Sequence, residues 1–377
     1  MFARVLQKLL FVTCLGLATP ALAVTGVTDN RIVLGQSAAL SGPAEALGRE
    51  MRLGAKLYFD EVNAAGGVHG RRIELRSLDD GYEPDRAAAN TRLLIEREQV
   101  FALFGYVGTP TSKAALPVFT EARVPFIAPF TGAELLRQPF NRLIFNLRAS
   151  YYDETAKIVD SFVALGMRKV AVFYQNDAYG QAGLTGVELA MKAKSLELVA
   201  TGTVERNTTE VAAAVAAIHA AKPDIVVMIS AYRSCAAFIK AMHAAGSFAS
   251  FYNVSFVGSR QLADELGSQG VGVGISQVMP FPWNESLPVV REYRRLLAQV
   301  NGEPSFTSLE GYIAAKVMVE GLQRAGRELD RDRLMSALES MGQFDTGGFV
   351  VGFGPRDHAG SDFVELTIIG RNGRFLH

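Results

Sequence analysis

Small and hydroxyl-bearing residues follow three apolar runs in the first half of the chain. They are "SAALSGPAEALG" (37–48), "GYVGTPTS" (105–112) and "APFTGAE" (128–134). Thr109 and Thr131 lie at or just before a predicted helix start, where a hydroxyl can cap backbone N–H groups and stabilise the helix by ~1 kcal/mol. The same N–H groups can bind an anion. Capping and ligand contact are therefore both open for these two threonines.

Aromatic and cationic residues follow the apolar runs of the second half. Tyr179 and Tyr232 can each press a flat apolar face on a ligand and keep a hydroxyl for a polar group, although tyrosines are also common at exposed helix starts. Arg260, in "FVGSRQL" (256–262), comes after an apolar run and a small-residue turn. Its guanidinium is a rigid fork that fits a carboxylate, and a solvated surface position is the alternative.

Signatures of catalysis and of cofactor binding are missing from the sequence. There is no Walker-type glycine loop, and "GVGVGISQ" (270–277) fits neither a dinucleotide fingerprint nor a nucleophile elbow. Asp79 and Asp80 are adjacent, but a solvated turn or a helix cap explains them. The five histidines are too scattered for a metal site. We therefore expect no enzyme, no cofactor and no metal.

The length of 377 residues favours two domains, and a composition of 49% hydrophobic and 20% charged residues is typical of a soluble globular protein. Arg4 and Lys8 precede the apolar run "LLFVTCLGLA", and "ALA" (21–23) supplies small residues, so we expect a signal peptide cleaved after Ala23. Its removal takes two of 38 basic residues and leaves 36 against 38 acidic ones. That balance predicts no nucleic-acid partner and no anionic membrane partner. Only Cys235 then remains, so no intrachain disulfide is expected.

From residue 31 onward, short apolar runs alternate with amphipathic stretches, which predicts parallel strands joined by crossover helices. The alternation restarts near residue 150, and the helical stretch 286–341 is expected to return to the first sheet. We also predict a strand over "VSFVGS" (254–259) and a terminal antiparallel hairpin formed by "FVVGF" (349–353) and "FVELTIIG" (363–370). The predicted fold class is α/β, with two Rossmann-like lobes built on parallel sheets.

Three segments are expected to cross between the lobes, near Leu147, Val278 and Val351. The predicted division is the signal peptide (1–23), a first lobe (24–147 and 279–350) and a second lobe (148–278 and 351–377). Ligands of open parallel sheets bind beyond the carboxyl ends of the strands. The polar residues that follow the strands are therefore expected to meet between the lobes.

The chain resembles the periplasmic ligand-binding proteins of ABC transporters, in the leucine/isoleucine/valine-binding branch of the type I fold. The resemblance covers nearly the whole chain after residue 23. It rests on "LSGPAEALGREMRLGAKLYFDEVNAAGGVHGRRIEL", "DDGYEPDRAAANTRLLI", "YGQAGLTGVE" and "SLEGYIAAKVMVEGL". It implies two lobes joined by three crossing strands, which clamp a small molecule by hinge motion.

The resemblance also implies which residues bind the ligand. The family holds the ligand carboxylate on hydroxyl and backbone groups of the first lobe and adds tyrosines from the second. Ser150 and Tyr151 fall at the first crossing and are expected to line the cleft. The matching positions in the two lobes are Gly108, Thr109, Phe130 and Thr131, then Tyr179 and either Ala231 or Tyr232.

The departures from the family pattern concern the ligand. Leu47 stands where branched-chain binders have an aromatic residue, and Tyr82 and Gly108 stand where they have a cysteine pair. Arg260 stands where they have an acidic residue for the ligand's ammonium, and a cation cannot pair with an ammonium. Unless Glu154, Asp177 or another acid takes that role, a standard α-amino acid fits poorly, and a carboxylate without an amine, such as an aromatic or aliphatic acid, fits better.

The leading hypothesis is a monomeric periplasmic receptor that delivers a small carboxylate-bearing ligand to an ABC permease in the inner membrane. The alternative is a ligand-sensing periplasmic protein that works through a membrane signalling partner. A secreted enzyme would need a nucleophile and base, or a metal, and the sequence offers no such set. The sequence names neither the ligand nor the permease.

Overall fold

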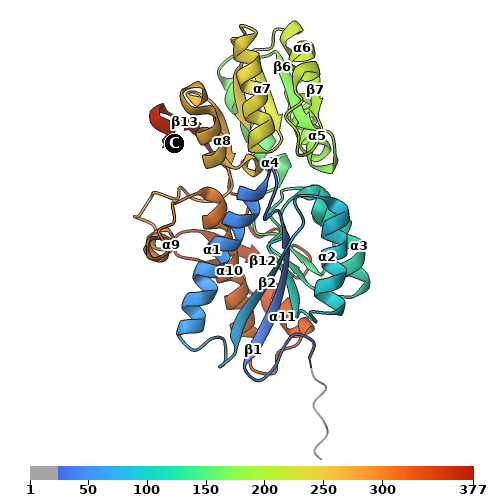
Figure 1. Cartoon of the computed structure of the whole chain (residues 1–377), viewed down its shortest axis with the longest axis vertical. Helices are drawn as coiled ribbons and strands as arrows, with labels where there is room; N and C mark the ends of the chain where they lie inside the picture. The colour runs from blue at the N-terminus through green and yellow to red at the C-terminus, as the bar shows by residue number, and fades with distance from the viewer. Residues whose placement is uncertain (1–23) are drawn as a thin grey trace, which may run out of the picture.

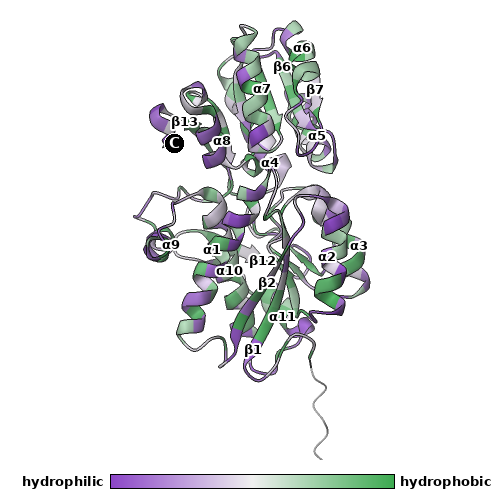
Figure 2. Ribbon diagram, in the orientation of Figure 1, coloured by the Kyte–Doolittle hydropathy of each residue, from purple (hydrophilic) through white to green (hydrophobic). Residues whose placement is uncertain are grey.

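The structure is a computed structural model that describes residues 24–377. The signal peptide predicted for residues 1–23 lies outside this range. Two lobes lie one above the other along the long axis, each built on its own sheet (Figure 1). Hydrophobic residues are concentrated on the inner strands, and hydrophilic residues lie mainly on the outer helix turns (Figure 2). Within residues 24–377, no helix has the length and apolarity needed to cross a membrane.

The first lobe has a five-stranded parallel sheet in the order β2-β1-β3-β4-β5. Helix α1 covers one face, and α2 and α3 cover the other (Figure 1). Because both faces are covered, seven of the eight residues of β1 are buried, and Ile32 to Leu34 form an uninterrupted apolar run. The elements are β1 (Arg31–Ala38), α1 (Glu45–Ala64), β2 (Arg72–Asp79), α2 (Pro84–Glu96), β3 (Ala102–Phe104), α3 (Thr109–Glu121), β4 (Phe126–Ile127) and β5 (Ile144–Phe145).

The second lobe has a seven-stranded sheet in the order β14-β13-β10-β9-β8-β6-β7. Strands β6 to β10 pair in parallel, and β13 adds to β10 in the antiparallel direction. The predicted parallel sheets in two lobes are therefore confirmed. The elements are α4 (Tyr151–Ala164), β6 (Val170–Gln175), α5 (Ala178–Ala193), β7 (Leu198–Val204), α6 (Ala212–Ala220), β8 (Ile225–Ile229), α7 (Tyr232–Ala244), β9 (Ser250–Asn253), α8 (Ser259–Leu266), β10 (Gly274–Gln277), β13 (Glu365–Ile369) and β14 (Phe375–Leu376).

Helices α9 (Pro288–Gln299), α10 (Phe306–Ala325) and α11 (Arg331–Glu339) return to the first lobe, as predicted. Helix α10 packs along α1 (Figure 1). At Gly54 of α1 an added Cβ would lie 1.7 Å from the carbonyl oxygen of Ser308. A side chain there would separate the two helices, so a glycine is required at their closest approach.

Two predictions about the strands are wrong. Strand β12 (Val350–Phe353) pairs with β11 (Gly342–Asp345), whereas β13 pairs with β10 and β14. The terminal hairpin does not form, because the segment between β12 and β13 passes from one lobe to the other. The strand predicted over 254–259 is also wrong, because β9 ends at Asn253 and a 3₁₀ turn (Ser255–Val257) leads into α8. A buried turn can be as apolar as a strand, so composition did not separate them.

Three segments connect the lobes. They lie between β5 and α4 (146–150), between β10 and α9 (278–287), and between β12 and β13 (354–364). The first and third segments meet, since Asn146 forms a parallel bridge with Ala359. The exact lobe boundaries stay a prediction from the sequence. The third crossing begins after Val351, because β12 still pairs with β11 at that residue.

Candidate functional site

Five aromatic rings meet where the two lobes come together, and we call them the aromatic cluster. Phe256 is central, with ring centroids 5.8 Å from Tyr82, 5.4 Å from Phe130 and 4.7 Å from Tyr179. Tyr151 extends the cluster, 5.3 Å from Tyr179. Each of the five is at most 1% exposed. Tyr82 and Phe130 follow β2 and β4 of the first lobe, whereas Tyr179 and Phe256 come from the second, so the cluster forms only when the lobes are closed.

Hydroxyl groups adjoin the aromatic cluster on the side of the first lobe. The Oγ1 atoms of Thr109 and Thr131 lie 2.6 Å apart, and Thr131 Oγ1 donates to the Tyr151 hydroxyl at 3.3 Å. Thr109 is the first residue of α3, and no side chain caps that helix. The uncapped N–H groups and the hydroxyls together make a favourable place for a carboxylate.

Gly108 precedes α3 and lies directly against the aromatic cluster. Its φ is +99°, and an added Cβ would lie 2.2 Å from Cε2 of Tyr82. A larger residue would therefore strain the backbone and displace the Tyr82 ring. The glycine lets the start of α3 and the ring of Tyr82 approach each other.

Some buried polar atoms around the cluster have no hydrogen-bond partner among residues 24–377. They include the Tyr179 hydroxyl, Ser230 Oγ and Arg148 Nη1. Burial raises the pKa of Tyr179 well above its usual range, so its hydroxyl keeps its proton. Buried polar groups are nearly always paired in native proteins. These atoms are therefore candidates for contact with a bound molecule.

Two acids near the cluster each accept three hydrogen bonds from protein groups. Glu154 accepts hydrogen bonds from the Ser255 N–H at 2.7 Å, the Ser255 hydroxyl at 3.0 Å and the Ser276 hydroxyl at 2.5 Å. Burial raises the pKa of Glu154. Asp177 accepts from the Tyr179 N–H at 2.9 Å, from Gln175 at 2.7 Å and from Arg206 at 3.1 Å. Each carboxylate therefore already accepts three hydrogen bonds, and the ammonium of a ligand would compete with these donors.

Arg148 forms a buried ion pair at the first crossing. Its Nε and Nη2 donate to the Glu310 carboxylate at 2.9 and 2.7 Å, and its guanidinium lies 4.3 Å from the centroid of the Phe130 ring. Burial alone would lower the pKa of Arg148, but Glu310 outweighs it and raises the pKa. The pair ties the crossing segment to α10 beside the aromatic cluster.

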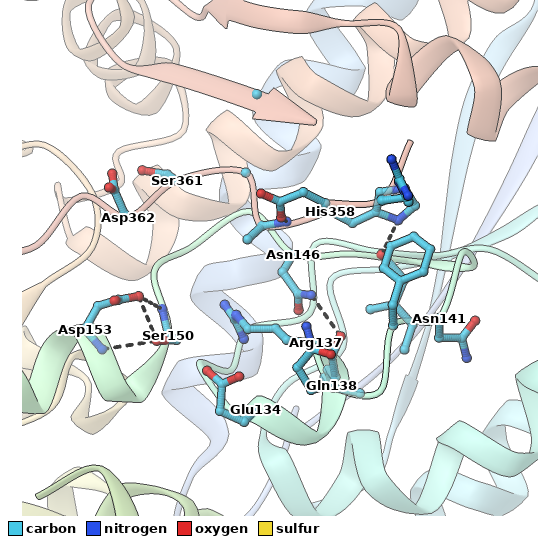
Figure 3. Close-up of a pocket in the computed structure, with 18 of the residues that line it drawn as sticks. Glu134, Arg137, Gln138, Asn141, Asn146, Ser150, Asp153, His358, Ser361 and Asp362 are labelled. Atoms are coloured by element: carbon cyan, nitrogen blue, oxygen red, sulfur yellow. Dashed lines mark hydrogen bonds between the residues drawn. The ribbon is translucent and has the colours of Figure 1, made fainter. Parts of the chain in front are cut away.

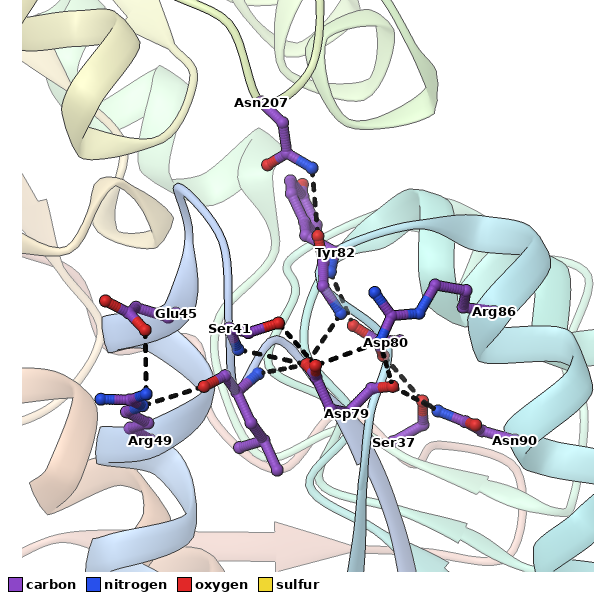
Figure 4. A network of polar contacts seen from close by, with 12 residues as sticks. Ser37, Ser41, Glu45, Arg49, Asp79, Asp80, Tyr82, Arg86, Asn90 and Asn207 are labelled. Carbon is purple, nitrogen blue, oxygen red and sulfur yellow. Dashed lines mark hydrogen bonds and ion pairs between the residues drawn. The ribbon is translucent and has the colours of Figure 1, made fainter.

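Asp79 and Asp80 hold the loop that carries Tyr82 (Figure 4). The Asp80 carboxylate accepts from the Ser37 hydroxyl at 2.7 Å and from the Tyr82 N–H at 2.8 Å, which fixes Tyr82 at a φ of +65°. Burial raises the pKa of Asp80 to about 6. Burial would also raise the pKa of Asp79, but hydrogen bonds, chiefly from Ser41, lower it to about 2. The pair therefore positions the loop, and the solvated turn expected for Asp80 is wrong because its side chain is buried.

Polar contacts join the lobes on two sides of the aromatic cluster. On one side, which we call the Arg206 bridge, Arg206 Nη2 donates to Glu83 at 2.8 Å. In the same bridge, Asn207 Nδ2 donates to the Gly81 carbonyl at 3.0 Å, and Figure 4 shows Asn207 above the loop that carries Tyr82. On the other side, the Arg260 bridge, Arg260 pairs with Glu303, and Gln261 donates to Glu50 at 2.5 Å. Both bridges would break if the lobes parted.

Most of the sequence matches a known family. A family model described as periplasmic binding protein covers residues 31–370. The chain belongs to the periplasmic binding protein family. It is similar to the crystal structure of a possible leucine/isoleucine/valine-binding protein from Rhodopirellula baltica SH 1, with 36% identity, a TM-score of 0.87 and coverage of 96% of this chain and 98% of that one.

Two further relatives agree with this assignment. A substrate-binding periplasmic protein from Ralstonia solanacearum is 34% identical, with a TM-score of 0.87 and coverage of 92% of this chain and 99% of that one. The Leu/Ile/Val-binding protein homolog 8 of Brucella suis biovar 1 is 24% identical over 384 residues, which span 97% of this chain and 93% of the relative. The resemblance to the leucine/isoleucine/valine-binding branch is therefore confirmed. This periplasmic binding protein binds a small molecule and is not an enzyme.

The structure brings most of the predicted ligand-binding residues of this periplasmic binding protein together. Tyr232 lies nearby at the start of α7, where it and Leu47 flank Gly258. Ser150 instead caps α4, accepting from the Asp153 N–H at 3.1 Å. Arg260 is the second residue of α8, 30% exposed, and pairs with Glu303 and with Asp264 at 3.6 Å. The residues gathered at the aromatic cluster are Gly108, Thr109, Phe130, Thr131, Tyr151 and Tyr179.

Three residues of the site were missed by sequence reasoning. Phe256 was placed in a strand that does not exist, and Tyr82 was noted only as the counterpart of a family cysteine. Arg148 sits in the crossing segment, and nothing in its neighbourhood predicted an ion pair with Glu310, 162 residues away. The signal for Tyr82 was its position directly after the acidic end of β2. Within residues 24–377, no group of acidic, histidine or cysteine side chains could hold a metal ion.

Proposed function

We propose that this protein is the extracytoplasmic receptor of an ABC importer and clamps a small carboxylate-bearing ligand between its lobes. The observation that carries the proposal is the uncapped start of α3 beside the hydroxyls of Thr109 and Thr131. These donors adjoin the aromatic cluster, which offers an apolar surface for the body of the ligand. Polar groups that fix one end and rings that enclose the rest are typical of a small-molecule site.

An aromatic or aliphatic acid is the preferred ligand, and a branched-chain amino acid is the second choice. An amino acid would need an acceptor for its ammonium, and Glu154 and Asp177 each already accept three hydrogen bonds from other donors. The unpaired Tyr179 hydroxyl and Ser230 Oγ can each accept one hydrogen bond, but neither carries the charge that an ammonium needs. A ligand without an amine therefore costs less to bury.

Binding requires the lobes to part. In the closed state a cavity of about 10 Å³ lies beside Phe130 and Arg148, which holds no more than a water molecule. The ligand would enter an open form and replace the contacts between rings on closure. We also propose that the protein is a periplasmic monomer whose signal peptide is cleaved after Ala23. It would deliver its ligand to a permease in the inner membrane.

A thermal-shift screen with matched ligand pairs tests the proposal. Leucine is compared with 4-methylpentanoate, and phenylalanine with 3-phenylpropanoate, so that each pair differs only in the amine. We expect an acid without an amine to raise the melting temperature by mass action. Thr131→Val should remove most of that rise, whereas Thr203→Val, on the exposed face of β7, should not.

Two outcomes would contradict the proposal in different ways. A shift with the amino acids alone would exclude the preferred ligand class and leave the receptor function standing. Chemical conversion of a responding compound would exclude the receptor function itself.

A further inference from the structure

A second cavity lies beside the hinge, which consists of the three segments that connect the lobes, and it shares no residue with the aromatic cluster. Its volume is about 590 Å³, and it is bounded by the loop after β4, the first crossing and the third crossing (Figure 3). Ser150 lines this cavity, whereas the next residue, Tyr151, belongs to the aromatic cluster. The first crossing therefore contributes neighbouring residues to two separate sites. We call this cavity the hinge pocket.

The hinge pocket contains a buried hydrogen-bond acceptor that has no donor among the described residues. Asn146, which is 1% exposed, donates through Nδ2 to the Leu136 carbonyl at 3.0 Å, and its Oδ1 has no partner among residues 24–377. The orientation of the amide is fixed, because only the NH₂ group can donate to a carbonyl. A bound molecule would therefore have to present a hydrogen-bond donor to Asn146 Oδ1.

The charge of the lining favours a cation. Four carboxylates and two guanidiniums line the hinge pocket, which leaves two negative charges in excess: Glu134, Asp153, Asp357 and Asp362 against Arg137 and Arg356. Within the described residues, the carboxylates of Glu134 and Asp362 make no side-chain hydrogen bond or ion pair, and Figure 3 shows both at the wall of the pocket. The field of the pocket attracts positive charge.

The two guanidiniums reduce this attraction but do not reverse it, because four carboxylates outnumber them. Arg137 is committed to the backbone, with Nη2 2.7 Å from the Arg148 carbonyl oxygen and Nη1 3.2 Å from the Ala133 carbonyl oxygen. Arg356 is exposed at the rim, where water solvates it. Glu134 is more enclosed, as a half-buried residue. Arg137 keeps its positive charge beside Glu134 and Asp153, so the negative excess belongs to the lining as a whole, and Asn146 Oδ1 supplies the buried acceptor.

We propose that the hinge pocket binds an organic ammonium compound, with one ammonium group between Asn146 Oδ1 and Glu134 and a second positive group toward Asp362. A metal ion is a poorer occupant, since no described group of acidic, histidine or cysteine side chains could hold one. An ammonium group supplies the donors that Asn146 Oδ1 lacks and the charge that the two free carboxylates lack. The bound molecule would contact both the first and the third crossing.

Isothermal titration calorimetry with three probes of equal length tests the site. The probes are 1,4-diaminobutane, butane-1,4-diol and succinate, which differ in charge and not in span. We expect saturable binding of 1,4-diaminobutane and no binding of the other two. Absence of saturable diamine binding, or equal binding of the diol or of succinate, would overturn the proposal.

Variants then place the diamine in the hinge pocket. Glu134→Gln should weaken diamine binding about tenfold, as expected for loss of a charge-assisted hydrogen bond. Asp362→Asn should weaken it about threefold because that carboxylate is exposed, and Arg356→Ala should strengthen it. Glu197→Gln, on the exposed surface of the second lobe, is the matched control. If the diamine binds Glu134→Gln as well as the parent protein, with unchanged melting temperatures, it binds elsewhere and the proposal fails.

Discussion

Arg206 of the second lobe reaches across to Glu83 of the first, with Nη2 2.8 Å from Oε2. Its Nη1 lies 3.1 Å from Oδ2 of Asp177 in its own lobe. One guanidinium therefore joins a rigid anchor in the second lobe to the loop that carries Tyr82 in the first. The contact is made only while the lobes are closed, so it favours closure without touching the aromatic cluster.

Arg206→Ala should weaken ligand binding without altering ligand preference. The pair is partly exposed, so we expect a loss of at most about 1 kcal/mol, or roughly fivefold in affinity. Small-angle X-ray scattering should also give a larger radius of gyration for the ligand-free variant, because the open form gains population. Lys194→Ala, which breaks an exposed pair with Asp160 inside the second lobe, should change neither quantity.

Arg260 and Glu303 should behave as a pair across the lobes. We expect Arg260→Ala and Glu303→Ala to weaken binding of a responding acid by the same few-fold factor, since each removes the Arg260–Glu303 ion pair. The affinity of both variants is measured by calorimetry. A direct contact between Arg260 and the ligand carboxylate, as predicted from the sequence, would give a different result. Arg260→Ala would then lose far more affinity than Glu303→Ala, because the Glu303→Ala variant keeps the Arg260 guanidinium and leaves it free for the ligand.

Tyr179→Phe should have opposite effects on stability and on binding. In the ligand-free protein the buried hydroxyl has no partner, so its removal should be neutral or should stabilise by about 1 kcal/mol. If the hydroxyl bonds to the ligand, affinity should fall about tenfold. Thermal melting and calorimetry on one preparation measure the two effects. Tyr106→Phe is the control, because its hydroxyl lies 3.1 Å from Thr91 Oγ1 and its loss should only destabilise.

Most of the fold could be predicted because each strand and helix is indicated by residues that are close together in the sequence. Each lobe repeats strand and helix, and the buried strands show as apolar runs such as Ile32 to Leu34. The failures occurred where the partner is distant in sequence. Strand β13 pairs with β10, about 90 residues earlier, and no local pattern distinguishes that partner from β12.

The candidate site was predicted less completely, for a related reason. Thr109, Thr131 and Tyr179 follow strands, and strand ends can be located from sequence. The direction of a side chain at a strand end depends on the conformation of the turn that follows the strand. Arg260 and Phe256 are an example. They are four residues apart, yet Phe256 lies at the centre of the aromatic cluster and Arg260 lies on the rim with Glu303.

Asp80 should make stability fall between pH 4 and pH 6. Burial raises its native pKa to about 6, above the usual range of an aspartate, so the native state holds the proton more tightly than the unfolded state. The stabilisation is complete below about pH 4 and is lost as pH rises through about 6, a change of up to roughly 3 kcal/mol. Denaturation by urea at several pH values should show this fall, and Asp80→Asn should lack it. An exposed acid variant, Asp160→Asn, should keep it.

The buried pair of Arg148 and Glu310 should show a large cost for either partner alone and a small cost for both. Their side chains are 1% and 3% exposed, so Glu310→Leu leaves a buried guanidinium and Arg148→Met leaves a buried carboxylate. We expect each single variant to lose about 3 to 5 kcal/mol of unfolding free energy. The double variant should recover most of that loss, because two apolar side chains of similar volume need no solvation. Glu154 also interacts with Arg148 and should make Arg148→Met the more damaging change. Arg295→Ala, which breaks an exposed pair with Glu61, should cost less than about 1 kcal/mol. A double variant as unstable as the single ones would mean that the crossing segment needs the charges themselves.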